Sequence, residues 1–372
     1  MLLPPLWKVK RELVRVWTKT KSPFLGAADP YRQSNHDRKF DQRVRITESG
    51  CKIGDRVAIL VIFQPKGIAD STYMTLDHLV ANRFDVIVVC NGPHPKADVE
   101  RLGKVAVMTV ERPNIGYDFG AYRDGLRIVR SKGVALTRLV FMNDSTWFPL
   151  RETDDTLERM DAKCGGLIGH VFKVRSTDRK FAHVESHLLM FSGEGVNSQS
   201  FNEFWAKFVM SNRHSTTVQR GEKQLTQKML TSGLAVDCLA SRELMLALLS
   251  KLNSAALREV ASNVLHHRED GRVFIRDILA RWDTDEGASG EFMNWVNLVL
   301  SKDSYQLSTS FIHPAMRYGI QGFVKKKKST RFHLARKEVL RMEAEGLIPP
   351  LNLAVRTEML ALVDQWKQPQ QK

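Results

Sequence analysis

The sequence predicts an α/β fold, with a mostly parallel, Rossmann-related sheet flanked by helices and a helical C-terminal region after it. Apolar, β-branched runs of buried-strand length lie at residues 57–63, 85–90, 105–110 and 138–143. Apolar residues at helical spacing separate these runs, around residues 73–80 and again around 122–129. Alternation of strand and helix is typical of a parallel sheet covered on both faces, so we expect the ligand-binding edge of such a sheet here.

Composition divides the chain into three parts. Residues 1–50 form a basic, amphipathic N-terminal extension, and residues 51–235 form the α/β domain. Residues 236–372 form a mainly helical region that contains a basic patch at 325–341. Further elements are expected as strands at 165–171 and 187–192 and as helices at 201–210, 221–230, 333–345 and 353–366.

The chain of 372 residues carries a net charge of +15, which favours an anionic partner. Residues 1–50 hold eleven Lys and Arg against five acids, and residues 325–341 hold eight against one. The excess therefore lies at the two ends, outside the predicted sheet. The sequence has no zinc-finger, helix-turn-helix or RNP-like string, so we expect no nucleic-acid partner.

The two basic segments each have two interpretations. Residues 4–21 have the pattern of a basic amphipathic helix, which either lies on an anionic membrane with Trp7 and Trp17 at the interface or packs on the main domain. The run Lys325–Lys328 either contacts anionic lipid or only adds solubilising charge. We expect no membrane span and no signal peptide, and scattered cysteines suit a reducing compartment. These features predict a cytoplasmic protein bound peripherally to the inner face of a plasma membrane.

Polar residues follow the predicted strands at the edge where open α/β sheets bind ligands. Asn91 follows the second strand, and the third is followed by a loop with two glycines, Gly116 and Gly120, and with Asn114 and Asp118. Small residues let a ligand approach the backbone, and a glycine before a helix start is a common way to hold a diphosphate. The alternative is a loop eased by glycine, in which Asp118 caps the helix.

The fourth strand ends in Asn143-Asp144-Ser145. A carboxylate at the end of a buried strand is unfavourable unless it is paired, hydrogen-bonded or bound to a cation. A divalent cation, Mg²⁺ or Mn²⁺, that bridges Asp144 to a substrate diphosphate satisfies this requirement. The alternative is that Asp144 caps a helix or pairs with Arg151.

Several strings in this order resemble the rhamnan synthesis F family of bacterial polysaccharide glycosyltransferases. They are N-x-G-x-D-x-G-A-Y at 114–122, LVFMNDS at 139–145, HVESHLLMFS at 183–192 and GEKQLTQKMLTSG at 221–233. The resemblance implies a GT-A-like transferase of cell-surface polysaccharide or lipopolysaccharide assembly. Its donor would be a nucleotide-sugar, with a deoxyhexose such as rhamnose as the sugar, and its acceptor a lipid-linked sugar or a growing polysaccharide. The GT-A group carries Asp-x-Asp at the place where this chain has Asn143-Asp144-Ser145, so one of the two acids is missing.

Sugar transfer needs a neutralised leaving diphosphate and a base for the acceptor hydroxyl. Asp144 is the candidate for the metal and diphosphate, and Arg123 is a second group for the diphosphate. Glu222, which starts the helix that resembles the acceptor-side helix of the GT-A group, is the candidate base, with Asp118 as the other candidate.

His183, Glu185 and His187 alternate along a predicted strand, so their side chains share one face of it. That face has three interpretations: an acceptor site, a metal site, or a polar surface without a ligand. Two functions besides the transferase stay open: a catalytically inactive, membrane-associated assembly partner and, more weakly supported, a nucleic-acid-binding protein.

Overall fold

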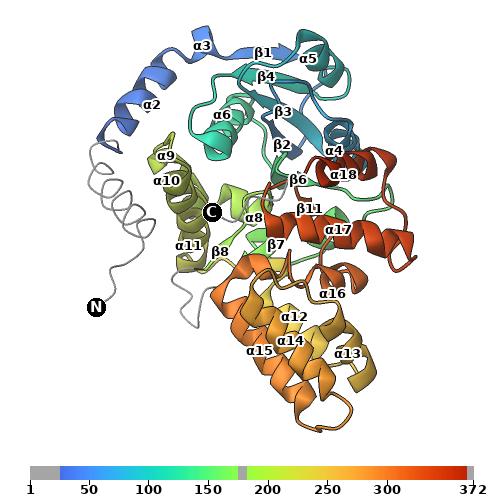
Figure 1. The fold of residues 1–372 in the computed structure, drawn as a ribbon. Helices are drawn as coiled ribbons and strands as arrows, with labels where there is room; N and C mark the ends of the chain where they lie inside the picture. Colours follow the sequence, from blue (N-terminus) through green and yellow to red (C-terminus); the bar gives the residue numbers. More distant parts are fainter. Residues whose placement is uncertain (1–25, 175–181, 367–372) are drawn as a thin grey trace, which may run out of the picture.

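The computed structural model describes residues 26–174 and 182–366. Within these residues the chain forms a nine-stranded mixed sheet with helices on both of its faces, a small two-stranded sheet and a helical C-terminal region (Figure 1). The predicted basic helix at 4–21, with Trp7 and Trp17, lies outside the described residues. No described helix combines the length and the hydropathy needed to cross a bilayer.

The sheet is mixed, which corrects the prediction of a mostly parallel one. Its order is β1-β4-β3-β2-β5-β9-β7-β10, with β8 beside β7. Four neighbouring strands are parallel: β4 (Met108–Arg112), β3 (Asp85–Asn91), β2 (Arg56–Ile62) and β5 (Arg138–Asn143). The strands added around them are β1 (Arg45–Glu48), β7 (Leu167–Lys173), β8 (His183–Val184), β9 (Leu188–Ser192) and β10 (Val236–Ala240).

Antiparallel pairs flank the four parallel strands on both sides. Strand β9 runs antiparallel to both β5 and β7, β8 to β7, and β1 to β4, whereas β10 is parallel to β7. A run of apolar residues reports that a strand is buried but not its direction, so the sequence pattern could not reveal this change.

Strand β2 shows how both faces of the sheet are buried. Ala58, Leu60 and Ile62 belong to one hydrophobic cluster, and Val57, Ile59 and Val61 belong to another. This division follows the alternation of side chains along a strand. The first cluster is covered by α4 (Asp70–Ala81), α5 (Lys96–Leu102) and α7 (Thr156–Asp161), and the second by α6 (Tyr117–Ser131), α9 (Gln199–Lys207) and α11 (Gln224–Thr231).

The C-terminal region adds two groups of helices. The first group packs onto the β10 end of the sheet and extends away from it at the bottom of Figure 1. It comprises α12 (Arg242–Leu249), α13 (Ser254–Ser262), α14 (Glu269–Ala280) and α15 (Ala288–Lys302). The second group has its own core around the buried Trp147; it comprises α16 (Ile312–Arg317), α17 (Thr330–Ala344) and α18 (Leu353–Asp364). The two-residue strands β6 (Thr146–Trp147) and β11 (Val324–Lys325) pair and join this second group to the end of β5.

The described segment from residue 26 to 54 contains α2 (Asp29–Arg38), α3 (Phe40–Arg43) and β1, none of which the sequence pattern predicts. Helix α2 is polar throughout and has no apolar stripe to identify it. A buried polar contact holds it instead: His36 Nε2 lies 2.8 Å from Asp124 Oδ2, and Arg112 Nε donates to the same oxygen at 2.6 Å. The helix thus depends on tertiary contacts with α6 and β4.

Candidate functional site

A cavity of about 1030 Å³, here called the main cavity, lies at the carboxyl ends of the parallel strands. The sheet and the start of α6 contribute polar side chains, namely Asn91, Asn114, Asp118, Asn143 and Asp144. The chain around β8 and β9 and the turn before α11 contribute His183, Glu185, Ser186, His187 and Glu222. The C-terminal region closes the cavity with Lys302, Asp303, Tyr305, Lys325 and Lys327. Three distant parts of the sequence therefore meet at the predicted edge.

Two carboxylates in the main cavity meet at the hydroxyl of Ser186. The Oγ atom of Ser186 lies 2.9 Å from Asp118 Oδ2 and 2.5 Å from Glu222 Oε1. Burial, reinforced by the negative charge of Glu222, raises the pKa of Asp118 to about 6. A hydroxyl has one proton to donate, so a protonated Asp118 completes the chain from Asp118 through Ser186 to Glu222. This arrangement can take up and release a proton near neutral pH.

Local backbone structure places these two acids together. Asp118 lies in the first turn of α6, after Gly116, which has a φ of +78° that favours glycine. Glu222 lies in a π-helical turn, η2 (Gln219–Lys223), which leads into α11. A Cβ atom on Gly221 would come within 2.6 Å of the Phe119 ring, so glycine lets this turn approach α6 closely. The turn thereby brings Glu222 to Asp118.

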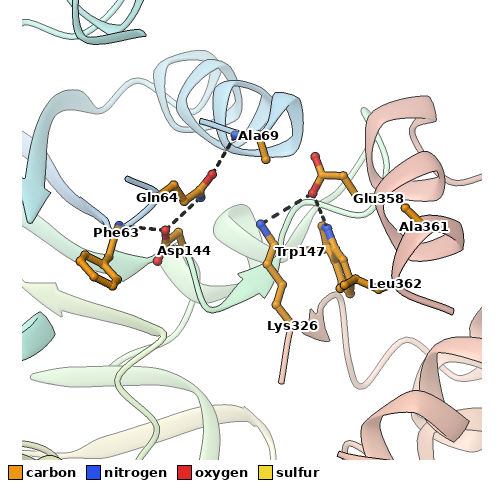
Figure 2. A pocket seen from close by; sticks show the side chains of 9 residues that line it. All are labelled: Phe63, Gln64, Ala69, Asp144, Trp147, Lys326, Glu358, Ala361 and Leu362. Carbon is orange, nitrogen blue, oxygen red and sulfur yellow. Dashed lines mark hydrogen bonds and ion pairs between the residues drawn. The ribbon is translucent and has the colours of Figure 1, made fainter. Parts of the chain in front are cut away.

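Asp144 is held by the end of β2 (Figure 2). Its Oδ2 atom accepts the Phe63 N–H at 2.9 Å and the Gln64 side-chain N–H at 2.9 Å. This corrects the alternative of a helix cap or a partner for Arg151. The neighbouring Asn143 donates to Asp118 Oδ2 at 3.1 Å, and its own oxygen accepts the Ser145 N–H at 3.1 Å. The strand end therefore orders Asp118 and Asp144 through a network of amides.

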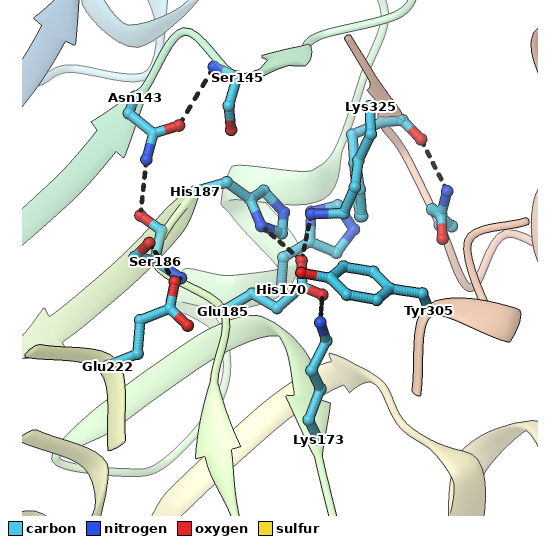
Figure 3. Close-up of polar contacts among 12 residues, drawn as sticks. Asn143, Ser145, His170, Lys173, Glu185, Ser186, His187, Glu222, Tyr305 and Lys325 are labelled. Carbon is cyan, nitrogen blue, oxygen red and sulfur yellow. Dashed lines mark hydrogen bonds and ion pairs between the residues drawn. The ribbon is translucent and has the colours of Figure 1, made fainter. Parts of the chain in front are cut away.

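A second group of buried charges lies beside the acids (Figure 3). The carboxylate of Glu185 forms ion pairs with both Lys173 and Lys325, and Nδ1 of His187 is 3.1 Å from the same carboxylate. Burial alone would raise the pKa of Glu185, but Lys173 and Lys325 outweigh it and hold that pKa well below its usual range. Burial, with the charge of Lys325, lowers the pKa of His187 to about 4, so this imidazole is neutral at neutral pH.

The structure brings most of the predicted site residues into one place. Among the described residues that line the main cavity are Asn91, Asn114, Asp118, Asn143, Asp144 and Glu222. The alternating set of His183, Glu185 and His187 also reaches it, although strand β8 includes only the first of these three residues. Asn91 is engaged on both sides of its amide, since it donates to the Tyr117 carbonyl at 3.2 Å and accepts from Arg112. Its part is to order the loop before α6.

Three predicted residues lie elsewhere. Arg123 points to α2 and donates twice to Asp37, at 2.7 and 2.8 Å, so its guanidinium is not at the diphosphate position. Gly116 and Gly120 pack against Met210, and a Cβ on Gly120 would lie 2.1 Å from the Ile115 carbonyl oxygen. Both glycines permit close packing of the backbone instead of lining the cavity.

The lysine run that begins in β11 contributes to two cavities, which its charge pattern alone did not predict. Lys325 and Lys327 line the main cavity. Lys326 lines a smaller one, of about 430 Å³, that shares Phe63 and Asp144 with it and is bounded by α18 (Figure 2). Side chains of an extended segment alternate in direction, and this alternation in the run Lys325–Lys328 was the available signal. Lys325 is therefore buried, which corrects the interpretation of the whole run as surface charge.

A metal site at this edge would rest on a single protein carboxylate. Among the described residues, no three His, Cys, Asp or Glu side chains are arranged to hold a metal ion. Asp144 uses one carboxylate oxygen for the two N–H donors of Phe63 and Gln64. A hard divalent cation often takes one protein carboxylate and completes its shell with substrate phosphates and water, so the other oxygen of Asp144 fits that role.

Comparison with known proteins agrees with the motifs. Residues 86–260 match the family model of rhamnan synthesis protein F. This match confirms the predicted family. Its segment contains the acid pair with Ser186, and it ends before the lysines of β11. The description of that family names rhamnan synthesis.

A relative from Sinorhizobium fredii, the uncharacterized protein y4gN, is 29% identical over 256 residues. The alignment covers 68% of this chain and 66% of the relative, just under two thirds of its length. Its name states no activity.

Proposed function

We propose that the chain is a nucleotide-sugar-dependent glycosyltransferase of cell-surface polysaccharide assembly, with a GT-A-like donor half. The observation that carries the proposal is the pair Asp118 and Glu222, joined by Ser186 in a cavity at the carboxyl ends of parallel strands. Open α/β sheets bind nucleotides at this edge, and sugar transfer needs a carboxylate close to the acceptor hydroxyl.

The donor half is proposed along the strand ends. The exposed Asn114, in the loop before α6, is the residue proposed for the nucleoside, since it lines the main cavity. The diphosphate would lie by Asn143-Asp144-Ser145 and the start of α6, where the helix dipole favours an anion. A divalent cation at Asp144 would neutralise the charge of the leaving diphosphate. The sugar itself, a deoxyhexose such as rhamnose, follows from the family alone.

The transfer step is assigned to Asp118. The acceptor oxygen forms a bond to the anomeric carbon, the bond from that carbon to the diphosphate oxygen breaks, and the hydroxyl proton passes to Asp118. Ser186 and Glu222 then provide a route for the proton away from the reacting centre. A base whose pKa is about 6 is ionised at neutral pH and still basic enough to accept a proton. Attack opposite the leaving group inverts the anomeric centre.

A catalytically inactive assembly partner is the second candidate function. The observation in its favour is the engagement of Asp144 by Phe63 and Gln64, together with the absence of a second acid at that strand end. Calorimetry with nucleoside diphosphates, with and without Mn²⁺, separates the two functions. The enzyme predicts binding in the micromolar range or tighter for at least one nucleotide, whereas no binding to any of them would favour the inactive partner.

Peripheral association with the inner face of the plasma membrane is proposed with the enzyme. The basic excess in residues 1–50 supports it, because basic residues are attracted to anionic lipid. A lipid-linked acceptor, which lies in the membrane, would also require it. Sedimentation with anionic vesicles, compared between the full chain and a chain that begins at residue 26, tests it. Equal sedimentation of both chains would contradict a role for the N-terminal segment.

A further inference from the structure

We propose that the main cavity has a second anion site, which binds the phosphate or diphosphate group of the acceptor. This site, here called the lysine face, consists of Lys173, Lys302, Lys325 and Lys327 around Tyr305. The assignment to the acceptor rests on the proposed transferase function. The anion site itself rests on charge and geometry.

The buried part of the lysine face has an excess of positive charge. Lys173 and Lys325 share one carboxylate, that of Glu185, and all three side chains are at most 8% exposed. The adjacent His187 adds no negative charge. Among these three buried side chains, two ammonium groups against one carboxylate leave one positive charge. An uncompensated buried charge is costly, so a bound anion would stabilise this arrangement.

The ammonium groups also have donors to spare. An ammonium has three N–H donors, and the polar contacts of Lys325 Nζ in the described residues reach Glu185 alone. Lys173 Nζ pairs with the same carboxylate and lies 3.5 Å from the centre of the Tyr305 ring. Figure 3 shows both lysines converging on Glu185 next to Tyr305. A phosphate in the cavity can accept the remaining hydrogen bonds.

Tyr305 connects the buried lysines to the exposed ones. Its hydroxyl accepts a hydrogen bond from Lys327 Nζ at 3.0 Å, and Lys327 also lies 4.5 Å from the ring centre. Asp303 in the same turn is already paired with Arg331, at 2.6 Å, so it does not cancel the lysines. Lys302 adds a further cation at the rim. The face thus offers cations from the buried interior to the solvent.

Position favours the acceptor over the donor. Glu185 and Ser186 are adjacent, and the first holds the lysines while the second holds the acid pair. Both groups line the main cavity, so the lysine face lies beside the proposed base. A sugar phosphate bound there would place a ring hydroxyl near Asp118. The donor diphosphate is proposed at the other side, by Asp144.

Calorimetry with inorganic pyrophosphate and with farnesyl diphosphate tests the site. We expect both probes to bind the full chain, also when a nucleoside diphosphate is saturating. Lys327→Gln should weaken the binding of both probes at least tenfold and leave the affinity for the nucleoside diphosphate unchanged. Lys328→Gln is the matched control, since Lys328 is the exposed next residue and does not line the cavity. Because Lys327 is exposed, its variant should keep the thermal midpoint of the wild type.

Each other outcome has a defined meaning. Competition between pyrophosphate and the nucleoside diphosphate would overturn the acceptor assignment, because the lysines would then hold the donor. Failure of both probes to bind would overturn the anion site. The same would follow if Lys328→Gln lost as much affinity for the probes as Lys327→Gln. Binding of pyrophosphate but not of farnesyl diphosphate would contradict a lipid-linked acceptor. If the probes bind in a way that depends on Lys327, but no nucleotide binds, the anion site would be supported and the proposed transferase function would be contradicted.

Discussion

Asp118 and Glu222 lie 104 positions apart in the sequence and meet through one hydroxyl group, that of Ser186. Each acid is placed by a feature of helix geometry: the first turn of α6 for Asp118 and the π-helical turn η2 for Glu222. Burial and the nearby charge of Glu222 raise the pKa of Asp118 to about 6, so Asp118 takes up a proton just below neutral pH. The chemistry of the cavity follows from this pair.

The pH profile of turnover should report the acid pair. Activity requires ionised Asp118, so it should rise with pH through about 6, the raised pKa of this group. Glu222→Gln removes the second cause of that raised pKa, and the rising limb should therefore move to lower pH. The measurement is kcat/KM between pH 4.5 and 8.5 for the wild type and for Glu222→Gln. A rising limb at the same pH in both proteins would contradict coupling of the two acids.

Glu185 should be important for stability as well as for the lysine face. Glu185→Gln leaves Lys173 and Lys325 buried without their shared partner, a change that typically costs about 3–5 kcal/mol. The free energy of unfolding from urea titration measures it. Glu203→Gln is the matched control, since Glu203 pairs with Lys228 at 2.8 Å in a solvent-accessible site and its loss should change the free energy of unfolding far less. Equal losses would show that the buried pair is not special.

Asp144 has a structural contact and a proposed role at the diphosphate, which two substitutions separate. Asp144→Asn keeps an oxygen that can accept the Phe63 N–H, whereas Asp144→Ala loses it. If the charge of Asp144 serves the diphosphate, both variants should lower donor turnover at least tenfold, and only Asp144→Ala should also lower the thermal midpoint. Turnover equal to that of the wild type in both variants would remove Asp144 from the mechanism.

For Arg123 we predict that substitution leaves donor binding unchanged. The sequence predicts it at the diphosphate, but the structure pairs it with Asp37 of α2. Arg123→Gln should therefore leave KM for the donor within about twofold of the wild type and lower only stability. A rise of tenfold or more in that KM, with normal folding by circular dichroism, would return Arg123 to the donor site.

The parallel half of the sheet was predictable because its strands are continuous apolar runs and their ends carry polar residues. Asn114, Asp118, Asn143 and Asp144 could be assigned to one edge on that basis. Strand direction after β5 could not, since β9 is as apolar as β5.

The lysine face as a whole could not be predicted from the sequence, because Lys173 and Tyr305 meet only through tertiary packing. Arg123 shows the same limit. Its sequence neighbours are in the site, but its position on α6 directs it to α2.

The most direct test of the proposed function is hydrolysis of nucleotide-sugars by the purified full chain. The panel should include nucleotide-activated rhamnose, and the proteins should be the wild type, Asp118→Asn and the exposed control Asp77→Asn on α4. A base in the transfer step typically contributes about 10²–10⁴-fold. We predict hydrolysis of at least one donor by the wild type and by Asp77→Asn, and at least a hundredfold less by Asp118→Asn. Equal hydrolysis by Asp118→Asn and the wild type, or none by any of the three proteins, would contradict the proposed transferase function.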